Sequence, residues 1–412
     1  MFGFRIIDLI RGTKTVPFFK RLKDIQFNDS DFLTQQSERS LKDLWEEVKG
    51  VDYYSGFNDL KDLPVLSKDL IKKEPSRFLN NEINRKNWIR KKTGGSTGIP
   101  FVYYTSKKSQ SYLWAGILLS WDAAGWKPDD KIVFLAGSSI IGRGWKQKIY
   151  YRLMNVIPLD SFDMSSTKMN CYLNILKNKK IRFVYGYANA IYHLAKYNIE
   201  HDVGVKLQSV ISTAENLKPI MRKTIEDSFD CEVFNQYGCN DAGLSAFECN
   251  KHKGLHVINS RAHIEVINEE LISTDLANNV MPMIRYNSGD RVQLSTNLCE
   301  CGRGFPLIKE IYGRSNDIIR NAETGAIIHS EFFNHLFRED SEIYTYQIKV
   351  NPINIHINII TIEKTAKKVQ SEDFYLKIIA EKTGYKSVTV NYNKELMTSE
   401  NGKVKTIINE EL

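Results

Sequence analysis

Thr93-Gly94-Gly95-Ser96-Thr97-Gly98-Ile99-Pro100 is the stretch that most constrains the fold, because three glycines and three hydroxyl side chains fall within its first six residues. Glycines let backbone N–H groups approach an oxyanion closely, and hydroxyl groups add further donors. Strand-like Phe101-Val102-Tyr103-Tyr104 follows, so the pattern predicts a phosphate-binding loop between sheet elements. A flexible surface turn is the alternative interpretation. The Gly-Lys-Ser/Thr ending of a Walker A loop is absent, which argues against a kinase-like or GTPase-like P-loop fold.

The sequence beyond this loop alternates between strand-like and helix-like patterns. We predict buried strands at 131–136, 181–185 and 209–212, and helices at 189–198 and 217–229. Strands that alternate with helices indicate an α/β core. From His263 onward, a predicted hairpin around residues 268–270 indicates a β-rich subdomain. The first 85 residues are predicted to form short helices, one of them capped by Ser40 before residues 44–48.

A second, smaller unit is predicted after about residue 316. It contains a hairpin formed by residues 344–350 and 353–362, a helix at 372–383 and a strand at 386–392. Residues 353, 355, 357 and 359 are all isoleucine. This spacing of two residues is typical of a strand with one buried face. We therefore expect a large N-terminal α/β domain over 1–315 and a small α+β domain over 316–412.

Composition excludes several classes of protein. The 412 residues are 42% hydrophobic and 26% charged, with a net charge of +8 spread along the chain. This is the balance of a globular protein, and no interleaved basic and aromatic stripe predicts nucleic-acid binding. No signal peptide or run of 18 apolar residues is present, so a cytoplasmic location is expected. The basic, apolar segment from Phe2 to Lys23 is expected to pack on its own domain, and peripheral contact with a membrane surface is the alternative.

Five further segments, taken with the glycine-rich loop, resemble in their order the motifs of the adenylate-forming superfamily. They are Ser212–Glu215, Asn235–Asp241, Arg285–Asp290, Tyr312–Asp317 and Asn401–Lys405. The resemblance is to the phenylacetate–coenzyme A ligase branch and its capsular-polysaccharide CapK relatives, from about residue 60 to residue 320 and again at the C-terminus. It implies an adenylate-forming enzyme fold with a mobile C-terminal domain, and an AMP-forming ligase that uses ATP to activate a carboxylic acid as an acyl-AMP.

The resemblance assigns the nucleotide site residue by residue. Thr93, Gly94, Gly95, Ser96, Thr97 and Gly98 would close over the β- and γ-phosphates, although Ile99 stands where the family often has lysine. The backbone of Ala214 and Glu215 would line the adenine. Tyr237, next to Gly238, offers a ring to stack on adenine, and Asn235 can bind its amino group. Asp241 takes the place of a magnesium-binding glutamate, because Mg²⁺ prefers a hard carboxylate shared with phosphates.

Three more residues complete the implied catalytic set. Asp290 would accept hydrogen bonds from both ribose hydroxyls. Arg314, in a hinge motif where Asn316 replaces the usual aspartate, would contact the ribose or α-phosphate. Lys403 would stabilise the charge that develops during adenylation, with Lys405 as the rival assignment and a solvated tail as the plain alternative.

Cys249, His256, Cys299 and Cys301 match a Cys, His and Cys-x-Cys pattern found in many relatives. Three thiolates and one imidazole make a closed tetrahedral site for structural Zn²⁺. His252 is an alternative to His256, and reduced cysteines packed as small hydrophobic side chains are the alternative to a metal site.

The acceptor and the acid remain open. Residues 320–326 differ in sequence from the segment that shapes the thiol channel in coenzyme A ligases of this family. The candidate acceptors of the acyl group are therefore coenzyme A, an amine and a sugar hydroxyl. Phe134–Gly137 and Tyr185–Ala188 are candidate walls of the acid pocket, and Tyr185 and Tyr187 could equally be core aromatics. A non-catalytic scaffold for polysaccharide assembly is the main rival function, and a basic protein that binds membranes or nucleic acid is the second.

Overall fold

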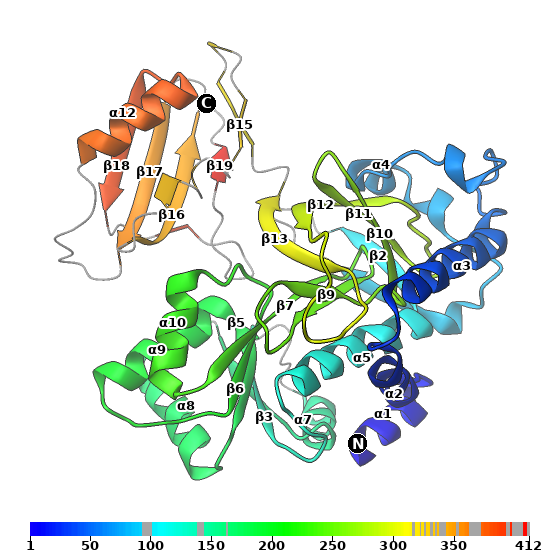
Figure 1. Ribbon diagram of the computed structural model, residues 1–412, viewed down its shortest axis with the longest axis horizontal. Coiled ribbons are helices and arrows are strands. Elements are labelled where there is room, and N and C mark those ends of the chain that lie inside the picture. The colour runs from blue at the N-terminus through cyan, green and yellow to red at the C-terminus, as the bar shows by residue number, and fades with distance from the viewer. Residues whose placement is uncertain are drawn as a thin grey trace. The chain divides into compact units, whose positions relative to one another are not determined.

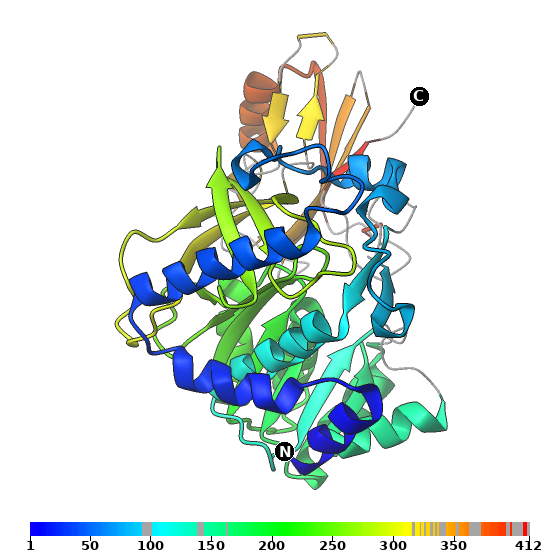
Figure 2. The same ribbon diagram turned by 90° about the vertical axis from the view of Figure 1, so that its right-hand side faces the viewer.

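The described residues of the computed structural model are 1–92, 101–137, 144–161, 164–314, 318–321, 323–324, 327–329, 333, 336–337, 343–351, 354–361, 372–392, 396–397 and 407–409. They fall into two compact units. The larger unit contains Met1–Gly95, Ile99–Ser288 and Val292–Ile311, and the smaller one consists chiefly of Tyr312–Leu412. Figure 1 and Figure 2 show the elements of each unit from two directions.

An 11-stranded sheet with the order β10-β11-β12-β13-β9-β8-β7-β6-β5-β3-β4 forms the frame of the larger unit. Its parallel part consists of β3 (Ile132–Ala136), β4 (Val156–Asp160), β5 (Phe183–Tyr187), β6 (Ser209–Thr213) and β7 (Glu232–Cys239). β3, β4 and β5 are nearly continuous apolar runs, as expected where helices cover both faces of a parallel sheet. The predicted strands at 131–136 and 209–212 are confirmed, and the one at 181–185 begins two residues later.

The remaining strands extend the same sheet in a mixed pattern. They are β8 (Leu244–Glu248), β9 (Leu255–Val257), β10 (Ala262–Ile267), β11 (Glu270–Asp275), β12 (Tyr286–Leu294) and β13 (Leu307–Arg314). β8 is antiparallel to β7, and β10 and β11 form the predicted hairpin, with Ile267 opposite Glu270. The β-rich region expected after His263 is therefore hydrogen-bonded into the main sheet.

Helices cover both faces of the parallel strands. α8 (Ser166–Asn178), α9 (Ala188–Glu200) and α10 (Pro219–Phe229) lie on one face, and α5 (Lys107–Ala123) lies on the other (Figure 1). The core beneath α5 includes Trp121, Phe183 and Phe234. α7 (Trp145–Leu153) precedes β4. Pro219 is the first residue of α10, where its missing N–H costs no helical hydrogen bond.

The N-terminal segment forms three helices: α1 (Phe2–Arg11), α2 (Thr15–Ile25) and α3 (Ser30–Val48). The predicted start near Ser40 is wrong, because Ser40 lies inside α3. The cap is Asp29, whose side chain accepts hydrogen bonds from the backbone N–H groups of Asp31 and Phe32. Short turns of 3₁₀-helix (Leu60–Asp62, Pro75–Phe78, Arg85–Asn87) and α4 (Lys68–Lys73) lead to the hairpin of β1 (Trp88–Lys92) and β2 (Val102–Ser106).

The smaller unit has its own core. β16 (Ile343–Val350), β17 (Asn354–Thr361), β18 (Ser387–Tyr392) and β19 (Ile407–Asn409) form a sheet in the order β18-β17-β16-β19, with α12 (Glu372–Thr383) beside β18. Ile355, Ile357 and Ile359 are fully buried, which confirms the period-two prediction. β14 (Ile318–Arg320) and β15 (Ile327–His329) pair separately. Among the described residues of both units, no helix is long and apolar enough to cross a membrane.

Candidate functional site

Most of the predicted nucleotide residues of the larger unit follow or end strands at one edge of the sheet. β5, β6 and β7 are parallel, with Tyr187 opposite Thr213 and Thr213 opposite Gln236, so their carboxyl ends meet. The chain runs from β3 to β4 on one side and then returns to β5 on the other side of β3. Ligands of open α/β sheets bind at such a reversal, outside the carboxyl ends of the strands.

The walls proposed for the acid pocket are neighbours at this reversal. Phe134 lies opposite Tyr185 in adjacent strands, and their rings meet edge to face with centroids 4.8 Å apart. Tyr185 also contacts Trp121 and is only 5% exposed, so it is a core aromatic. Tyr187 is less buried. Burial raises the pKa of its hydroxyl, and a hydrogen bond with the backbone of Gly137 acts in the opposite direction. Tyr187 is therefore the better candidate for contact with an acid.

Ala214 and Glu215 come directly after β6. Ala214 has a φ of 65°, a left-handed conformation that is uncommon for alanine and turns the chain sharply at the sheet edge. Glu215 Oε2 accepts hydrogen bonds from the backbone N–H and the side-chain Nδ2 of Asn189, at 2.9 and 3.0 Å. Asn189 is the second residue of α9, so the Glu215 carboxylate caps that helix. This leaves the backbone of the turn as the part of the segment that can line a ligand.

Asn235 and Tyr237 lie two residues apart in β7 and therefore point to the same face of the sheet. Both side chains are half-buried, whereas Gly238 is exposed. Tyr237 packs against the core that contains Leu244 and Ala246. A half-buried ring held at a strand end is suited to stacking on a flat aromatic ligand.

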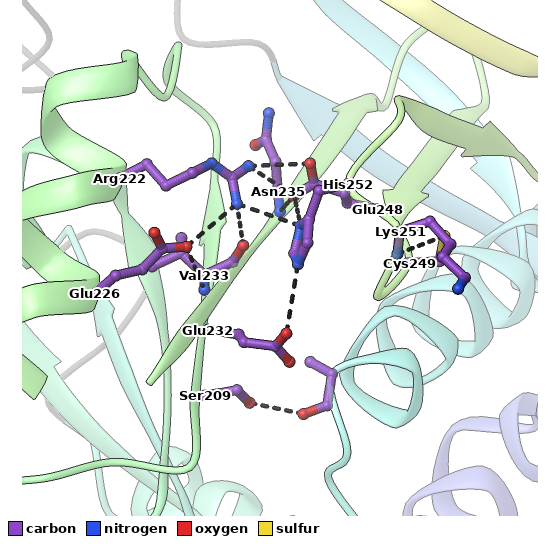
Figure 3. A network of polar contacts seen from close by, with 11 residues as sticks. Ser209, Arg222, Glu226, Glu232, Val233, Asn235, Glu248, Cys249, Lys251 and His252 are labelled. Carbon is purple, nitrogen blue, oxygen red and sulfur yellow. Dashed lines mark hydrogen bonds and ion pairs between the residues drawn. The ribbon is translucent and has the colours of Figure 1, made fainter. Parts of the chain in front are cut away.

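A buried ion-pair network holds the backbone of β7 at Asn235 (Figure 3). Glu248 Oε2 accepts the Asn235 backbone N–H at 2.8 Å, and Arg222 donates to both Glu248 oxygens at 3.0 and 2.7 Å. His252 Nδ1 lies 3.3 Å from the same carboxylate. Burial by itself would raise the pKa of Glu248, but His252 and Arg222 hold it below its ordinary value. The charged carboxylate thus fixes the strand that carries Asn235 and Tyr237.

Asp241 is buried, and its carboxylate has three partners. Its Oδ2 lies 2.9 Å from Lys68 Nζ and accepts the Tyr286 hydroxyl at 3.0 Å, while its Oδ1 accepts the Cys239 thiol at 3.1 Å. Burial alone would raise the pKa of Asp241, but the Lys68 ammonium and the three hydrogen bonds lower it overall. Asp241 is therefore a carboxylate that remains ionised inside the protein, paired with a cation that belongs to the chain itself.

Lys68 is held in this position by the backbone around it. Leu66 donates its N–H to the Arg285 carbonyl and accepts the N–H of Asn287, both at 2.9 Å, so this segment bridges to the start of β12. Ser67 then caps α4 through the Leu70 N–H. The Lys68 ammonium also lies 5.4 Å from the centre of the Phe101 ring. The Lys68 side chain is 36% exposed, so water and ligands can reach it.

The turn that carries Asp241 depends on Gly243. Its φ of 68° favours glycine, and an added Cβ would lie 2.2 Å from the Asp275 Cβ. The Gly243 N–H also faces the Asn240 carbonyl at 3.4 Å, which closes the turn between β7 and β8. No other residue type fits this position without moving the turn.

The other predicted nucleotide residues are placed only in part. Asp290 lies within β12, next to Gly289 with a φ of 78°, and is half-buried. Arg285, from the same motif, binds both oxygens of Glu265 through its guanidinium and is a structural residue. Arg314 is the last residue of β13, and its side chain lies outside the described part. Thr93, Gly94, Gly95, Ser96, Thr97 and Gly98, together with Asn316, Lys403 and Lys405, also lie outside the described residues.

The four predicted zinc ligands come together. The ligand atoms of Cys249, His256, Cys299 and Cys301 all lie within 4.8 Å of one another. Cys249 Sγ is 3.7 Å from Cys299 Sγ, and Cys301 Sγ is 3.3 Å from His256 Nε2. Burial and then Arg303 lower the pKa of His256 to about 4, so its ring is neutral, as a metal ligand must be. His252 is turned to Glu248 instead.

The Cys/His cluster sits where the N-terminal helices meet the sheet. Arg303, just beyond Cys301, donates to Gln26 Oε1 at 2.8 Å, and its guanidinium lies 5.2 Å from the centre of the Phe27 ring. Gly304 donates its N–H to the Gln26 carbonyl at 3.0 Å, and a Cβ there would lie 2.0 Å from the Asn28 carbonyl oxygen. The loop that carries two of the thiols thus fastens the connection between α2 and α3.

Sequence reasoning missed three residues of the site: Lys68, Tyr286 and Glu248. Lys68 lies far from Asp241 along the chain, and no local pattern links the two. Tyr286 stood in a recognised motif, but only the fold shows its hydroxyl at Asp241. Glu248 is a buried acid in a strand, and a buried acid implies a nearby cation, but its burial is known only from the fold.

The chain is similar in sequence to three curated proteins. CapK of Staphylococcus aureus is 25% identical over 322 residues, which cover 75% of this chain and 71% of CapK. Phenylacetate–coenzyme A ligase of Thermus thermophilus is 25% identical over 28% of this chain and 29% of its own length. Indoleacetate–lysine synthetase of Pseudomonas savastanoi is 23% identical over 30% of this chain and 32% of its own length. No family model matches the chain.

Solved structures resemble the fold over most of its length. A crystal structure of 2-hydroxyisobutyryl-CoA ligase in the postadenylation state, in complex with R3-HIB-AMP, gives a TM-score of 0.67 at 15% identity and covers 92% of this chain and 89% of the ligase. The amide bond synthetase McbA from Marinactinospora thermotolerans gives a TM-score of 0.53 at 12% identity, over 78% of this chain and 68% of McbA. At these identities the likeness establishes a shared fold.

Proposed function

We propose that this chain, an AMP-forming ligase of the adenylate-forming superfamily, joins a carboxylic acid to AMP with release of pyrophosphate and then passes the acyl group to an acceptor. The relationship to CapK and to phenylacetate–coenzyme A ligase supports this proposal. The single observation that carries it is the arrangement at the sheet edge. There the turn at Ala214, the β7 strand with Asn235 and Tyr237, and the buried Asp241 carboxylate lie on adjacent strand ends.

The adenosine half of ATP would bind against β6 and β7. In this proposal the backbone of Ala214 and Glu215 lines the adenine, Tyr237 stacks on it and Asn235 binds its amino group. The capping bond from Glu215 to Asn189 and the Glu248 network hold both segments rigid before the nucleotide arrives. Asp290 would accept the ribose hydroxyls. A rigid site binds with little loss of side-chain entropy.

The phosphates would be held by the loop Thr93–Gly98, by Arg314 and by Lys403. Backbone N–H groups of the glycine-rich loop would surround the β- and γ-phosphates. Lys403 would stabilise negative charge as the acid attacks the α-phosphate and pyrophosphate leaves. The proposal divides the chain into a binding domain over 1–315 and a lid over 316–412 that supplies Lys403.

Mg²⁺ is the cation that such a reaction uses, and the Asp241 carboxylate fits its preference for oxygen ligands. When bound, it would neutralise charge on the phosphates. The Lys68 ammonium lies 2.9 Å from Asp241 Oδ2 and would have to leave for the carboxylate to give that oxygen to the ion. A released Lys68, still tethered to α4, would be free to contact a phosphate. The chain would thus exchange one cation for another at Asp241 when the nucleotide binds.

The acceptor is proposed to be a thiol, an amine or a sugar hydroxyl, with coenzyme A as the leading thiol. A solved neighbour binds coenzyme A together with an acyl-AMP, which supports the thiol. The likeness to an indoleacetate–lysine synthetase and to an amide bond synthetase supports the amine. The sugar hydroxyl rests on the motif resemblance to capsular-polysaccharide CapK relatives alone.

The Cys249, His256, Cys299 and Cys301 cluster is proposed to bind structural Zn²⁺. Three sulfurs and a neutral imidazole within 4.8 Å of one another are the donor set of a closed zinc site. Such an ion would join the β8–β9 region to the loop before β13. Its role would be structural rather than catalytic, because a site with four protein ligands has no open position for substrate.

The test is ATP-dependent pyrophosphate release across a panel of carboxylic acids, with hydroxylamine present to trap acyl-AMP. We expect release with at least one acid, and its loss in Asp290→Ala and Lys403→Ala. Retained activity in Lys403→Ala would transfer the role to Lys405. ATP binding measured by calorimetry accompanies the assay. Protein that binds neither ATP nor a non-hydrolysable analogue would contradict the proposal and favour a non-catalytic scaffold.

A further inference from the structure

Two helices from distant parts of the larger unit form one surface that the proposed reaction does not use. The Arg11 guanidinium of α1 lies 4.4 Å from the centre of the Tyr150 ring of α7. The backbones are so close that a Cβ on Gly3 would lie 1.7 Å from the Leu153 carbonyl oxygen. We call the exposed side of these helices the α1–α7 surface. It joins the basic N-terminal segment to a helix that begins at residue 145.

Large apolar side chains are concentrated on the α1–α7 surface. Phe4 and Ile7 of α1 are buried against the unit, as expected for a packed helix. The same helix nevertheless leaves Phe2, Leu9 and Ile10 exposed to 78%, 85% and 74%, and α7 adds Trp145 at 69% and Ile149 at 51%. Exposed apolar patches of this kind mark interaction sites rather than ordinary surface.

The exposed charges of α1 and α7 are all basic. Arg5, Arg11, Lys146, Lys148 and Arg152 are exposed along the two helices, and α7 contains no acidic residue. The one acid of α1, Asp8, is buried, and its carboxylate accepts the Thr15 and Val16 N–H groups. Asp129, which lies 4.0 Å from the N-terminal amine, is a nearby exposed acid.

We propose that the α1–α7 surface binds the face of an anionic lipid bilayer. Interfacial helices carry Lys and Arg together with Trp, Phe and Leu, and their apolar side chains enter the headgroup boundary. On α7, Trp145, Lys148, Ile149 and Arg152 follow the i, i+3, i+4, i+7 spacing of one face. The five basic side chains, with no exposed acid on either helix, match the charge of an anionic bilayer.

The placement would bring an acyl-transfer enzyme to a membrane surface, where a lipid-linked acceptor or a membrane-extracted acid is found. The binding itself needs no nucleotide, because α1 and α7 supply none of the proposed ATP ligands. It can therefore be measured whether or not the proposed reaction occurs.

The experiment is flotation of the full chain with vesicles of 70% phosphatidylcholine and 30% phosphatidylglycerol, compared with pure phosphatidylcholine. We expect binding to the anionic vesicles that weakens with salt, and little binding to the neutral ones. Ile149→Asp and, separately, Leu9→Asp should weaken binding about tenfold, since each removes an apolar side chain that the bilayer would bury. Lys148→Glu should weaken it by about fivefold or more.

Ile199→Asp is the matched control, because Ile199 is an equally exposed isoleucine, at 55%, on α9. It should bind vesicles as the unmodified chain does, and circular dichroism should show all variants folded. No binding of the unmodified chain to anionic vesicles at low salt would overturn the proposal. So would equal binding by Ile149→Asp, Leu9→Asp and Ile199→Asp. A dimer in solution that Ile149→Asp converts to a monomer would assign the surface to a second copy of the chain instead.

Discussion

Asp241 shows what a single residue's environment adds to a motif. The motif and the chemistry of a carboxylate predict that it binds magnesium, and the structure shows that its two oxygens already have three partners. The partner with most consequence, Lys68, could not be predicted. It is one lysine among the 57 lysines and arginines of the chain, and only the strand bridge at Leu66 brings it to the site.

Lys68→Met should make the protein sensitive to magnesium. Removing the ammonium leaves the buried carboxylate short of a partner, which should cost about 1–3 kcal/mol of unfolding free energy. Mg²⁺ no longer competes with an internal cation, so millimolar Mg²⁺ should restore part of that loss in the variant and have little effect on the unmodified chain. Urea unfolding with and without Mg²⁺ measures both effects. Lys73→Met, an exposed lysine of the same helix, is the control. Identical magnesium dependence in all three proteins would contradict the exchange at Asp241.

The lowered pKa of Lys91 should make the stability of the protein depend on pH. Burial, and then the Arg261 charge, lower its pKa from 10.5 to about 8, with Asp275 opposing them. A lysine whose folded-state pKa is lowered destabilises the fold while charged, so stability should rise as the pH increases from 8 to 10.5. Lys91→Met should therefore be more stable at pH 7, by no more than about 3 kcal/mol, and the advantage should shrink above pH 8. The exposed neighbour Lys92→Met should show neither effect. An advantage that stays constant from pH 7 to 10.5 would rule out this account.

At the scale of elements, the sequence predicted what is local. The apolar runs became β3 and β6, the isoleucine alternation became β17, and Pro219 marked the start of α10. Ser40 was wrong as a helix start because an equally good cap, Asp29, stood eleven residues earlier and the apolar face continues between them. The sequence did not predict that strands β8 through β13 continue the main sheet. Pairs such as Leu307 with His256 join residues that are far apart in the sequence.

Glu215 is a motif residue whose side chain belongs to an element rather than to a ligand. Glu215→Ala should remove the acceptor at the N-terminus of α9 and destabilise the larger unit by about 0.5–2 kcal/mol. Glu215→Gln keeps one oxygen acceptor and should recover much of that loss. Urea unfolding compares the three proteins. An unchanged stability of Glu215→Ala would show that the capping bond contributes nothing, and would return the side chain to the list of possible nucleotide ligands.

At the scale of the whole molecule, each unit has a core of its own. We therefore expect two transitions in differential scanning calorimetry. The Cys/His cluster lies in the larger unit, so removal of metal by a strong chelator should lower only that transition, by several degrees. Cys301→Ser should abolish the response to chelator. Quantitative metal analysis of the purified protein should give one zinc per chain. A melting profile unaffected by complete metal removal would favour cysteines that only pack.

Substitution of Gly243 should inactivate the protein, although the residue has no side chain. A residue with no side chain contributes no ligand, charge or hydrogen-bonding group to any chemistry, so inspection of reacting groups would pass over it. Yet even the gain of one methyl group there collides with Asp275 and displaces the turn that presents Asp241. In a saturation screen for inactive but well-expressed alleles, Gly243 should appear beside Asp241 and Asp290.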